Sequence, residues 1–265
     1  MIYDDTYDRI IISKGDIFSL AKKRYNREGF WSLVRISFSF IKELFLVTIP
    51  NYICFLYYKL FKSSETFEFQ GKRFHYFFHP YCTTWRNERT VAVPIIWDTV
   101  KQYEGKKKNI LEVGNVLSYY FNVSHDVLDK YEIMDGVMNE DVVDFKPTRK
   151  YDLIVSIVTI GHVGWNESPK DPTKFIRAIE NLKRILSVSG QLVVVMGLGI
   201  NPSFDSSLES KTTEFNKQGY LRHLRGYIWQ EAKREEINDL KYDELVPTAN
   251  AVVIGEINHE SNGHR

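Results

Sequence analysis

Cysteine is scarce in this sequence, with Cys54 and Cys82 as the only two among 265 residues. Two cysteines cannot build a disulfide framework or a four-cysteine zinc site, so we expect a reducing compartment and a cytoplasmic protein. An excess of one charge is also missing, because 35 basic and 34 acidic side chains leave a formal net charge of +1. No global field attracts a polyanion, and nucleic acid is not expected as a partner.

Long hydrophobic runs are absent as well. In residues 30–62 charged residues and Pro50 interrupt the apolar residues, and the uninterrupted stretch from Leu44 to Ile49 is far shorter than the ~20 residues that span a bilayer. The N-terminus mixes acids and bases before any apolar run, which is unlike a secretory signal. A transmembrane helix is therefore not expected.

Residues 1–64 are predicted to form a helical arm, with two helices broken at Pro50. Two interpretations stay open. In one, residues 30–62 contact a membrane surface peripherally, with basic side chains toward the headgroups, namely Arg35, Lys42, Lys59 and Lys62. In the other, the arm packs on the rest of the chain or on a second subunit of a homodimer.

Residues 65–84 follow the arm and begin with aromatic and polar residues in alternation around Gly71, which predicts a β-hairpin acting as a lid. His75, His79 and Cys82 lie close together in the sequence. Because no fourth protein ligand accompanies them, ordinary polar contacts are favoured over metal binding, and no metal is expected.

Residues 85–258 alternate between strand and helix patterns, and residues 259–265 form a tail. Apolar runs predict strands over 109–114, 125–129, 151–157, 191–199 and 250–257. Helical spacing predicts helices over 86–103 and over 171–186, the second with Asp171 as N-cap. This alternation predicts an α/β, Rossmann-like, doubly wound sheet with helices on both faces.

Ligands of such sheets bind where the strands end, so the residues after each strand are informative. Glu112, Gly114 and Asn115 close the first strand, and Asp129 closes the second. The glycine lets backbone approach a ligand, and an acid at this distance is typical of a ribose-diol site. Taken alone, these residues suit NAD or another nucleotide equally well.

Four segments together give the sequence a more specific resemblance. They are ILEVGN (110–115), EDVVDF (140–145), YDLIVSIVTIGHVG (151–164) and ILSVSGQLVVVM (185–196). With Asp129 between the first two, the chain resembles the class I S-adenosylmethionine-dependent methyltransferases, in the same order over about 150 residues. The resemblance implies the seven-stranded methyltransferase type of sheet and S-adenosylmethionine as cofactor.

The resemblance also implies roles for the cofactor-binding candidates. Asp129 would bind the ribose hydroxyls, and Glu112 would face the ammonium group or orient the loop of Gly114 and Asn115; the plainer alternatives are a turn acid and a carboxylate that caps backbone N–H groups. Asp141 and the Val142 backbone would recognise adenine, with Asp144 as the competing acid and a surface turn as the alternative.

Two departures from the family pattern concern glycine. The first loop has Gly114 alone where two or three glycines are usual, and Gly161 stands where many relatives have an acid before the histidine. The first departure predicts that the amino acid end of the cofactor sits differently or binds weakly. The second puts in doubt an acid/base role for an acid at that position.

His162, just after the fourth strand of the pattern, is the candidate catalytic base, because a neutral imidazole accepts a proton near pH 7. A histidine that only holds its loop is the alternative. Candidate acceptor-binding residues are Trp85, Arg86, Arg89 and Trp165, against a solvated helix start and a structural tryptophan.

These observations predict a methyltransferase, with transfer to an oxygen of a small molecule, sugar or lipid-linked glycan. The preference for glycan modification rests on the aromatic-rich hairpin and on the arm. A catalytically inactive Rossmann-like scaffold is the main alternative, since fold does not secure function. A nicotinamide-dependent oxidoreductase is less favoured, because the first loop lacks the pattern G-x-G-x-x-G.

Overall fold

A computed structural model describes residues 31, 42, 44–210, 212–213, 215–237, 239, 241–243 and 248–258. The chain divides into two compact units, one of residues 1–63 with 78–83 and one of residues 64–77 with 84–265. Each unit is described by itself. The predictions for most of the arm, including Arg35, and for the tail 259–265 fall outside the described residues.

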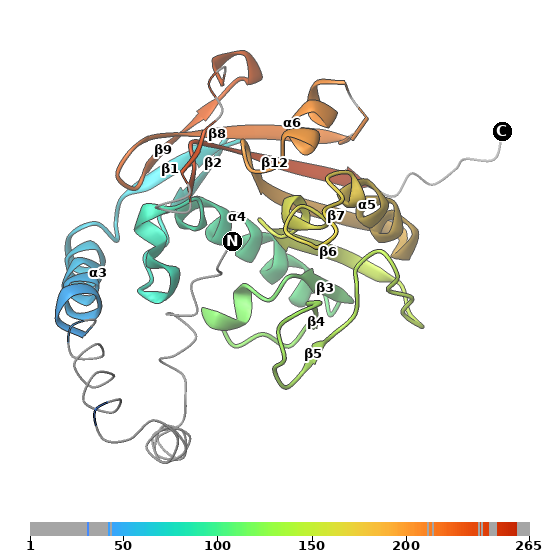
Figure 1. Cartoon of the computed structure of the whole chain (residues 1–265), viewed down its shortest axis with the longest axis horizontal. Coiled ribbons are helices and arrows are strands. Elements are labelled where there is room, and N and C mark those ends of the chain that lie inside the picture. The colour runs from blue at the N-terminus through green and yellow to red at the C-terminus, as the bar shows by residue number, and fades with distance from the viewer. Residues whose placement is uncertain are drawn as a thin grey trace. The chain divides into compact units, whose positions relative to one another are not determined.

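The first unit contains the π-helix η2 (Leu44–Thr48), which continues into the α-helix α3 (Ile49–Phe61) (Figure 1). The predicted break at Pro50 is a change of helix type, because Pro50 occupies the first turn of α3, where its missing N–H costs nothing. Within the described part of the chain, no helix is both long and apolar enough to cross a membrane.

The second unit is built on an eight-stranded sheet with the order β5-β4-β3-β6-β7-β12-β8-β9. Its first five strands in this order run parallel, whereas β12 is antiparallel to both of its neighbours and β9 is antiparallel to β8. The strands are β3 (Ile110–Val113), β4 (Asp126–Leu128), β5 (Val137–Met138), β6 (Tyr151–Ile157), β7 (Leu186–Gly197), β8 (Lys217–Arg225), β9 (Ile228–Ala232) and β12 (Ala251–Asn258).

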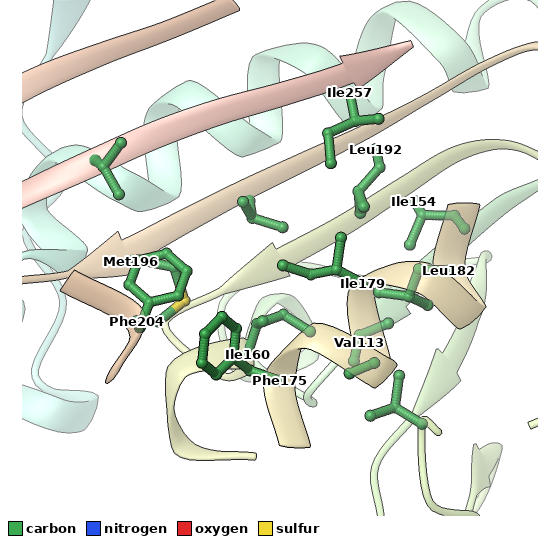
Figure 2. Close-up of a cluster of buried hydrophobic side chains, with 14 of the residues drawn as sticks. Val113, Ile154, Ile160, Phe175, Ile179, Leu182, Leu192, Met196, Phe204 and Ile257 are labelled. Atoms are coloured by element: carbon green, nitrogen blue, oxygen red, sulfur yellow. The ribbon is translucent and has the colours of Figure 1, made fainter. Parts of the chain in front are cut away.

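Helices cover both faces of this sheet. Figure 2 shows Phe175, Ile179 and Leu182 of α5 (Lys174–Ile185) packed with Ile154 of β6 and Leu192 of β7. Phe204 of α6 (Pro202–Glu209) joins this cluster. Because strand side chains alternate between faces, the other buried side chains of β6 face α4 (Arg89–Glu104), which packs against β3 and β6. The predicted Rossmann-like, doubly wound α/β sheet is confirmed.

Several element boundaries differ from the prediction. The helix predicted over 86–103 begins at Arg89 and continues through Pro94 to Glu104. Asp171 is not the N-cap of α5: its carboxylate instead accepts the Thr173 N–H at 3.1 Å in a turn before the helix, and Thr173 takes the cap position. A short polar side chain that bonds the backbone two residues on favours such a turn over a helix start.

The predicted hairpin consists of β1 (Thr66–Phe69) and β2 (Lys72–His75), with Gly71 at φ +76° in its turn. It packs against β9 and α4 of the second unit. The Tyr76 hydroxyl donates to the Trp229 carbonyl at 3.2 Å, and Glu231 accepts the Gln70 N–H at 3.1 Å. The hairpin therefore covers the β9 edge of the sheet, and its action as a lid stays a prediction.

Candidate functional site

The carboxyl ends of β3, β4 and β6 lie at one edge of the sheet, because β3 pairs in parallel with both of its neighbours. The site predicted from the sequence follows these strands. We call the residues after β3, β4 and β5 the cofactor side, and the residues after β6 together with the start of α4 the acceptor side. The two sides are built differently.

Glu112 is fully buried within β3, and its carboxylate orients the loop that follows. One oxygen, Oε1, accepts the N–H groups of Val116 and Leu117, both at 2.8 Å, and Oε2 lies 3.0 Å from His125 Nε2. Of the two roles considered from the sequence, this geometry matches loop orientation, because the carboxylate is fully buried and both of its oxygens have partners inside the protein. His125, which has only 2% of its side chain exposed, is a contact that the sequence pattern did not reveal.

Gly114 has a positive φ of +86°, and a Cβ built there would lie 1.9 Å from Thr159 Oγ1. The glycine therefore makes room for Thr159 from the loop after β6, and the approach of its backbone to a ligand stays a prediction. Val158, just before this threonine, has φ +61°. A β-branched residue is strained there by about 1–3 kcal/mol, and such strain clusters at functional sites.

Asp129 follows β4 and is half-buried. Its Oδ1 accepts the N–H groups of Tyr131 and Glu132, both at 2.9 Å, and its Oδ2 accepts the Asn115 N–H at 3.3 Å. The Asn115 side chain is buried and donates to Glu132 Oε1 at 2.9 Å. These bonds join the loops after β3 and β4. Oδ1 already has two partners, whereas Oδ2 has one and can accept a further hydrogen bond from a hydroxyl.

Asp141 belongs to a network of four charges. Its Oδ2 pairs with Lys130 at 2.8 Å and with Lys174 at 2.6 Å, and Glu167 Oε2 pairs with the same lysines at 3.1 and 2.6 Å. Burial alone would raise the pKa of Asp141, but the hydrogen bonds from Lys130 and Lys174 outweigh it and hold that pKa at about 2. We name these four residues the charge quartet.

The charge quartet leaves Asp141 little capacity for a ligand, since Oδ1 also accepts the Val143 N–H at 3.2 Å. An adenine amino group would share that oxygen. Val142 is buried, and its carbonyl accepts the side chain of buried Asn181 at 2.8 Å. Recognition of adenine by Asp141 and Val142 thus stays a prediction, while Asp144 is exposed.

His162 lies in the short helix η5 (Ile160–His162) after β6. Burial lowers its pKa, the positive charge of Arg89 lowers it further, and a hydrogen bond with Asn166 opposes both. The imidazole is therefore neutral at pH 7. The amide nitrogen Nδ2 of Asn166 lies 3.1 Å from Nδ1 of His162. A 180° turn of the Asn166 amide would place its oxygen there instead, where it would accept a hydrogen bond from a protonated Nδ1. In that tautomer Nε2 is able to accept a proton.

The remaining acceptor-side candidates have different environments. Arg89 donates to the Tyr120 hydroxyl at 3.1 Å, so its charge is held near the loop after β3. Trp85 is buried and Arg86 is exposed. The Lys170 ammonium lies 3.0 Å from the centre of the Trp165 ring, which gives this tryptophan a partner within its own loop.

The structure adds residues that the sequence analysis missed, chiefly Thr159, Tyr120, His125 and the quartet lysines Lys130 and Lys174. It also shows no group of three or more His, Cys, Asp or Glu side chains able to hold a metal among the residues it describes. His75 lies on β2, and His79 Nδ1 accepts the Tyr81 N–H at 3.1 Å.

No protein-family model and no curated protein matches the chain. Among solved structures it is similar to the N-methyltransferase NodS from Bradyrhizobium japonicum in complex with S-adenosylhomocysteine, with 11% identity over 66% of this chain and 94% of that one, at a TM-score of 0.38. It is also similar to a possible histamine N-methyltransferase from Thermotoga maritima, with 15% identity over 67% of this chain and 100% of that one, at a TM-score of 0.36. A third similar structure is the sugar N-methyltransferase KedS8 from Streptoalloteichus, with 14% identity over 63% of this chain and 87% of that one, at a TM-score of 0.32.

Proposed function

We propose that this chain is an S-adenosylmethionine-dependent methyltransferase that transfers a methyl group to an oxygen of a small molecule, sugar or glycan. The proposal rests on the arrangement of carboxylates on the cofactor side. There, a buried acid orients the loop after β3, and the half-exposed Asp129 follows the adjacent strand at the same edge. This donor set fits a nucleoside, because a carboxylate at that place accepts hydrogen bonds from a ribose diol.

The cofactor, when bound, supplies an electrophilic methyl group on a sulfonium. The loop after β3 would bind its amino acid end, Asp129 its ribose, and the 140–145 segment its adenine. Asn181 fixes that segment by donating to the carbonyls of Val142 and Phe145 at 2.8 and 2.9 Å. Transfer between aligned groups needs mainly a fixed approach, and this pre-formed hydrogen bonding provides one.

On the acceptor side, His162 would take the hydroxyl proton as the acceptor oxygen attacks. Its lowered pKa keeps the imidazole neutral and hence competent as a base at pH 7. Arg89 beside it favours an acceptor that carries negative charge or develops it during proton removal. An oxygen acceptor agrees with these two features better than a cationic amine.

Calorimetry with S-adenosylhomocysteine, with NAD as the competing ligand, tests the proposal. We expect binding of S-adenosylhomocysteine alone. Asp129→Ala should weaken it by ~1–3 kcal/mol, because a charged acceptor of a ribose hydroxyl is lost. Asp129→Asn should lose less, since one oxygen still accepts.

The matched control is Asp135, an exposed aspartate that lies with Asp129 between β4 and β5. Asp135→Ala should bind S-adenosylhomocysteine like the native protein. Preference for NAD would move the chain to the oxidoreductases. A well-folded protein that binds neither ligand would be an inactive scaffold.

A further inference from the structure

One face of α3 packs inside the first unit. The half-buried residues Asn51, Phe55 and Tyr58 recur at helical spacing and define this face. Tyr58 stacks on Phe78 with ring centroids 5.0 Å apart, and Phe55 meets His79 at 6.4 Å. The orientation of the helix within its unit is therefore fixed by aromatic contacts.

The rest of the η2–α3 surface is apolar and exposed. Leu60 and Phe61 are 70% and 68% exposed, and ten of the sixteen exposed large hydrophobic side chains of the described residues fall between positions 45 and 61. We call these ten the apolar face; they are Phe45, Leu46, Val47, Ile49, Tyr52, Ile53, Leu56, Tyr57, Leu60 and Phe61. Single exposed hydrophobics are ordinary on proteins, but such a concentration marks an interaction surface.

Within the segment that carries the apolar face, the charged side chains have one sign. Residues 44–64 include Lys59 and Lys62 and contain no Asp or Glu. Lys59 is exposed at the C-terminal end of α3, with its ammonium 5.5 Å from the centre of the Phe55 ring. A symmetric contact between two copies of this face would bring like-charged lysines toward one another, which is unfavourable. An anionic lipid surface supplies the complementary charge.

The dimensions of α3 also suit a surface. The 5 residues of η2 and the 13 of α3 together extend roughly 27 Å at 1.5 Å per residue, which is less than the ~30 Å hydrocarbon core of a bilayer. Tyrosines on the face, Tyr52 and Tyr57, combine an apolar ring with a polar tip, as side chains at the headgroup boundary do.

We propose that η2 and α3 lie in the interface of an anionic bilayer, with the apolar face inserted among the upper acyl chains and Lys59 and Lys62 at the headgroups. Such an anchor would bring the protein to acceptors that are lipids or are linked to lipids. The membrane contact itself does not depend on the proposed methyl transfer.

Co-sedimentation of the full chain with vesicles tests this. We expect binding to phosphatidylcholine vesicles that contain 30% phosphatidylserine, weaker binding to pure phosphatidylcholine, and a decrease as salt is raised. Leu60→Asp should lower the partition coefficient at least tenfold, because it places a charge in the apolar face. The double variant Lys59→Gln, Lys62→Gln should lower binding to the anionic vesicles about tenfold. Its binding to pure phosphatidylcholine should remain unchanged.

The control is Leu224→Asp, an exposed leucine of β8 in the other unit, which should bind vesicles like the native protein. Circular dichroism and S-adenosylhomocysteine affinity report folding and the proposed cofactor site independently of the vesicles. Native protein that stays in the supernatant overturns the membrane proposal, as does equal binding by native protein and Leu60→Asp. A vesicle-free dimer that Leu60→Asp converts to monomer would also overturn it and assign the face to a second copy.

Discussion

The cofactor side and the acceptor side share one edge of the sheet but are held in different ways. On the cofactor side, carboxylates accept backbone N–H groups at 2.8–3.3 Å, so Glu112 and Asp129 fix the loops locally. On the acceptor side, longer-range charges act, with Arg89 beside His162 and with Glu167 and Lys174 in the charge quartet. Backbone caps pre-form a site for one fixed ligand, whereas side-chain charges tune reactivity and position.

The charge quartet links the two sides. Lys130 and Asp141 follow β4 and β5, whereas Glu167 lies in the loop after β6 and Lys174 begins α5. Glu167 Oε1 also accepts the Gly164 N–H at 3.2 Å, which fixes the loop that carries His162. Four ion pairs of 2.6–3.1 Å join these loops. A substitution on one side should therefore alter the conformation of the loops on the other side.

The largest expected effect concerns chemistry on the acceptor side. His162→Ala should lower the turnover number ~10²–10⁴-fold while S-adenosylhomocysteine affinity stays nearly unchanged. Because burial and Arg89 hold the pKa of His162 below its usual 6.5, native activity should persist at pH 7 and fall only as the pH drops through that lowered value. Labelled methyl transfer to a panel of sugars and carboxylic acids between pH 5 and 8 measures both.

A flat pH profile, with mutant turnover within threefold of native, would make His162 structural. The acceptor would then be already ionised, such as a carboxylate, and alignment would suffice.

The next largest effect is expected where Gly114 of the cofactor side meets Thr159 of the acceptor side. Gly114→Ala should destabilise the protein by about 2–4 kcal/mol, since alanine is strained at φ +86° and its Cβ would collide with Thr159. Adding Thr159→Gly removes the collision and leaves the strain, so the double variant should recover part of the loss. Urea unfolding of the two single variants and the double variant gives the coupling energy. Strictly additive effects would show that Thr159 does not occupy this space in solution.

A smaller effect tests the charge quartet. Lys174→Met leaves Asp141 and Glu167 sharing Lys130, and we expect a loss of about 1–3 kcal/mol in the free energy of unfolding at pH 7. Asp141 has a folded pKa of about 2 against an ordinary 3.8, so its contribution is complete above pH 3.8 and is lost as the pH falls toward 2. The difference between native and variant should shrink accordingly in urea unfolding at pH 3.

Lys183→Met is the matched control, because Lys183 and Glu180 form an exposed pair on the same helix. It should cost less than about 0.5 kcal/mol. Equal losses for the two variants would reduce the quartet to ordinary surface pairs.

The sheet could be predicted from the sequence where burial on both faces makes a strand apolar throughout, as in β6, whose predicted and observed bounds agree. The strands β8 and β9 were missed because their sequences, KQGYLRHLR and IWQEA, mix exposed polar side chains with the buried ones. For α6 a signal existed, since Asn201 caps it and Pro202 begins it.

For the site, strand order brings Glu112, Gly114, Asp129 and His162 to one edge, so position along the pattern was enough to name them. The partners were not predictable. Thr159 opposite Gly114, His125 against Glu112 and the two lysines on Asp141 depend on loop conformation and side-chain direction, which leave no regular spacing in the sequence.

The smallest expected effect isolates how the acceptor side tunes its base. Arg89→Met keeps much of the side-chain volume and removes the cation that lowers the pKa of His162. The pKa of His162 should therefore rise by less than about one unit but stay below that of an exposed histidine, because burial, the larger cause, remains. Titration of the imidazole by NMR measures this without any acceptor, with His223, which accompanies Trp229 at the far side of the sheet, as an internal reference. If the pKa of His162 does not move while Arg89→Met still impairs methyl transfer, the arginine acts on the acceptor directly. If it moves and transfer at pH 7 is unaffected, Arg89 only widens the pH range over which His162 remains neutral.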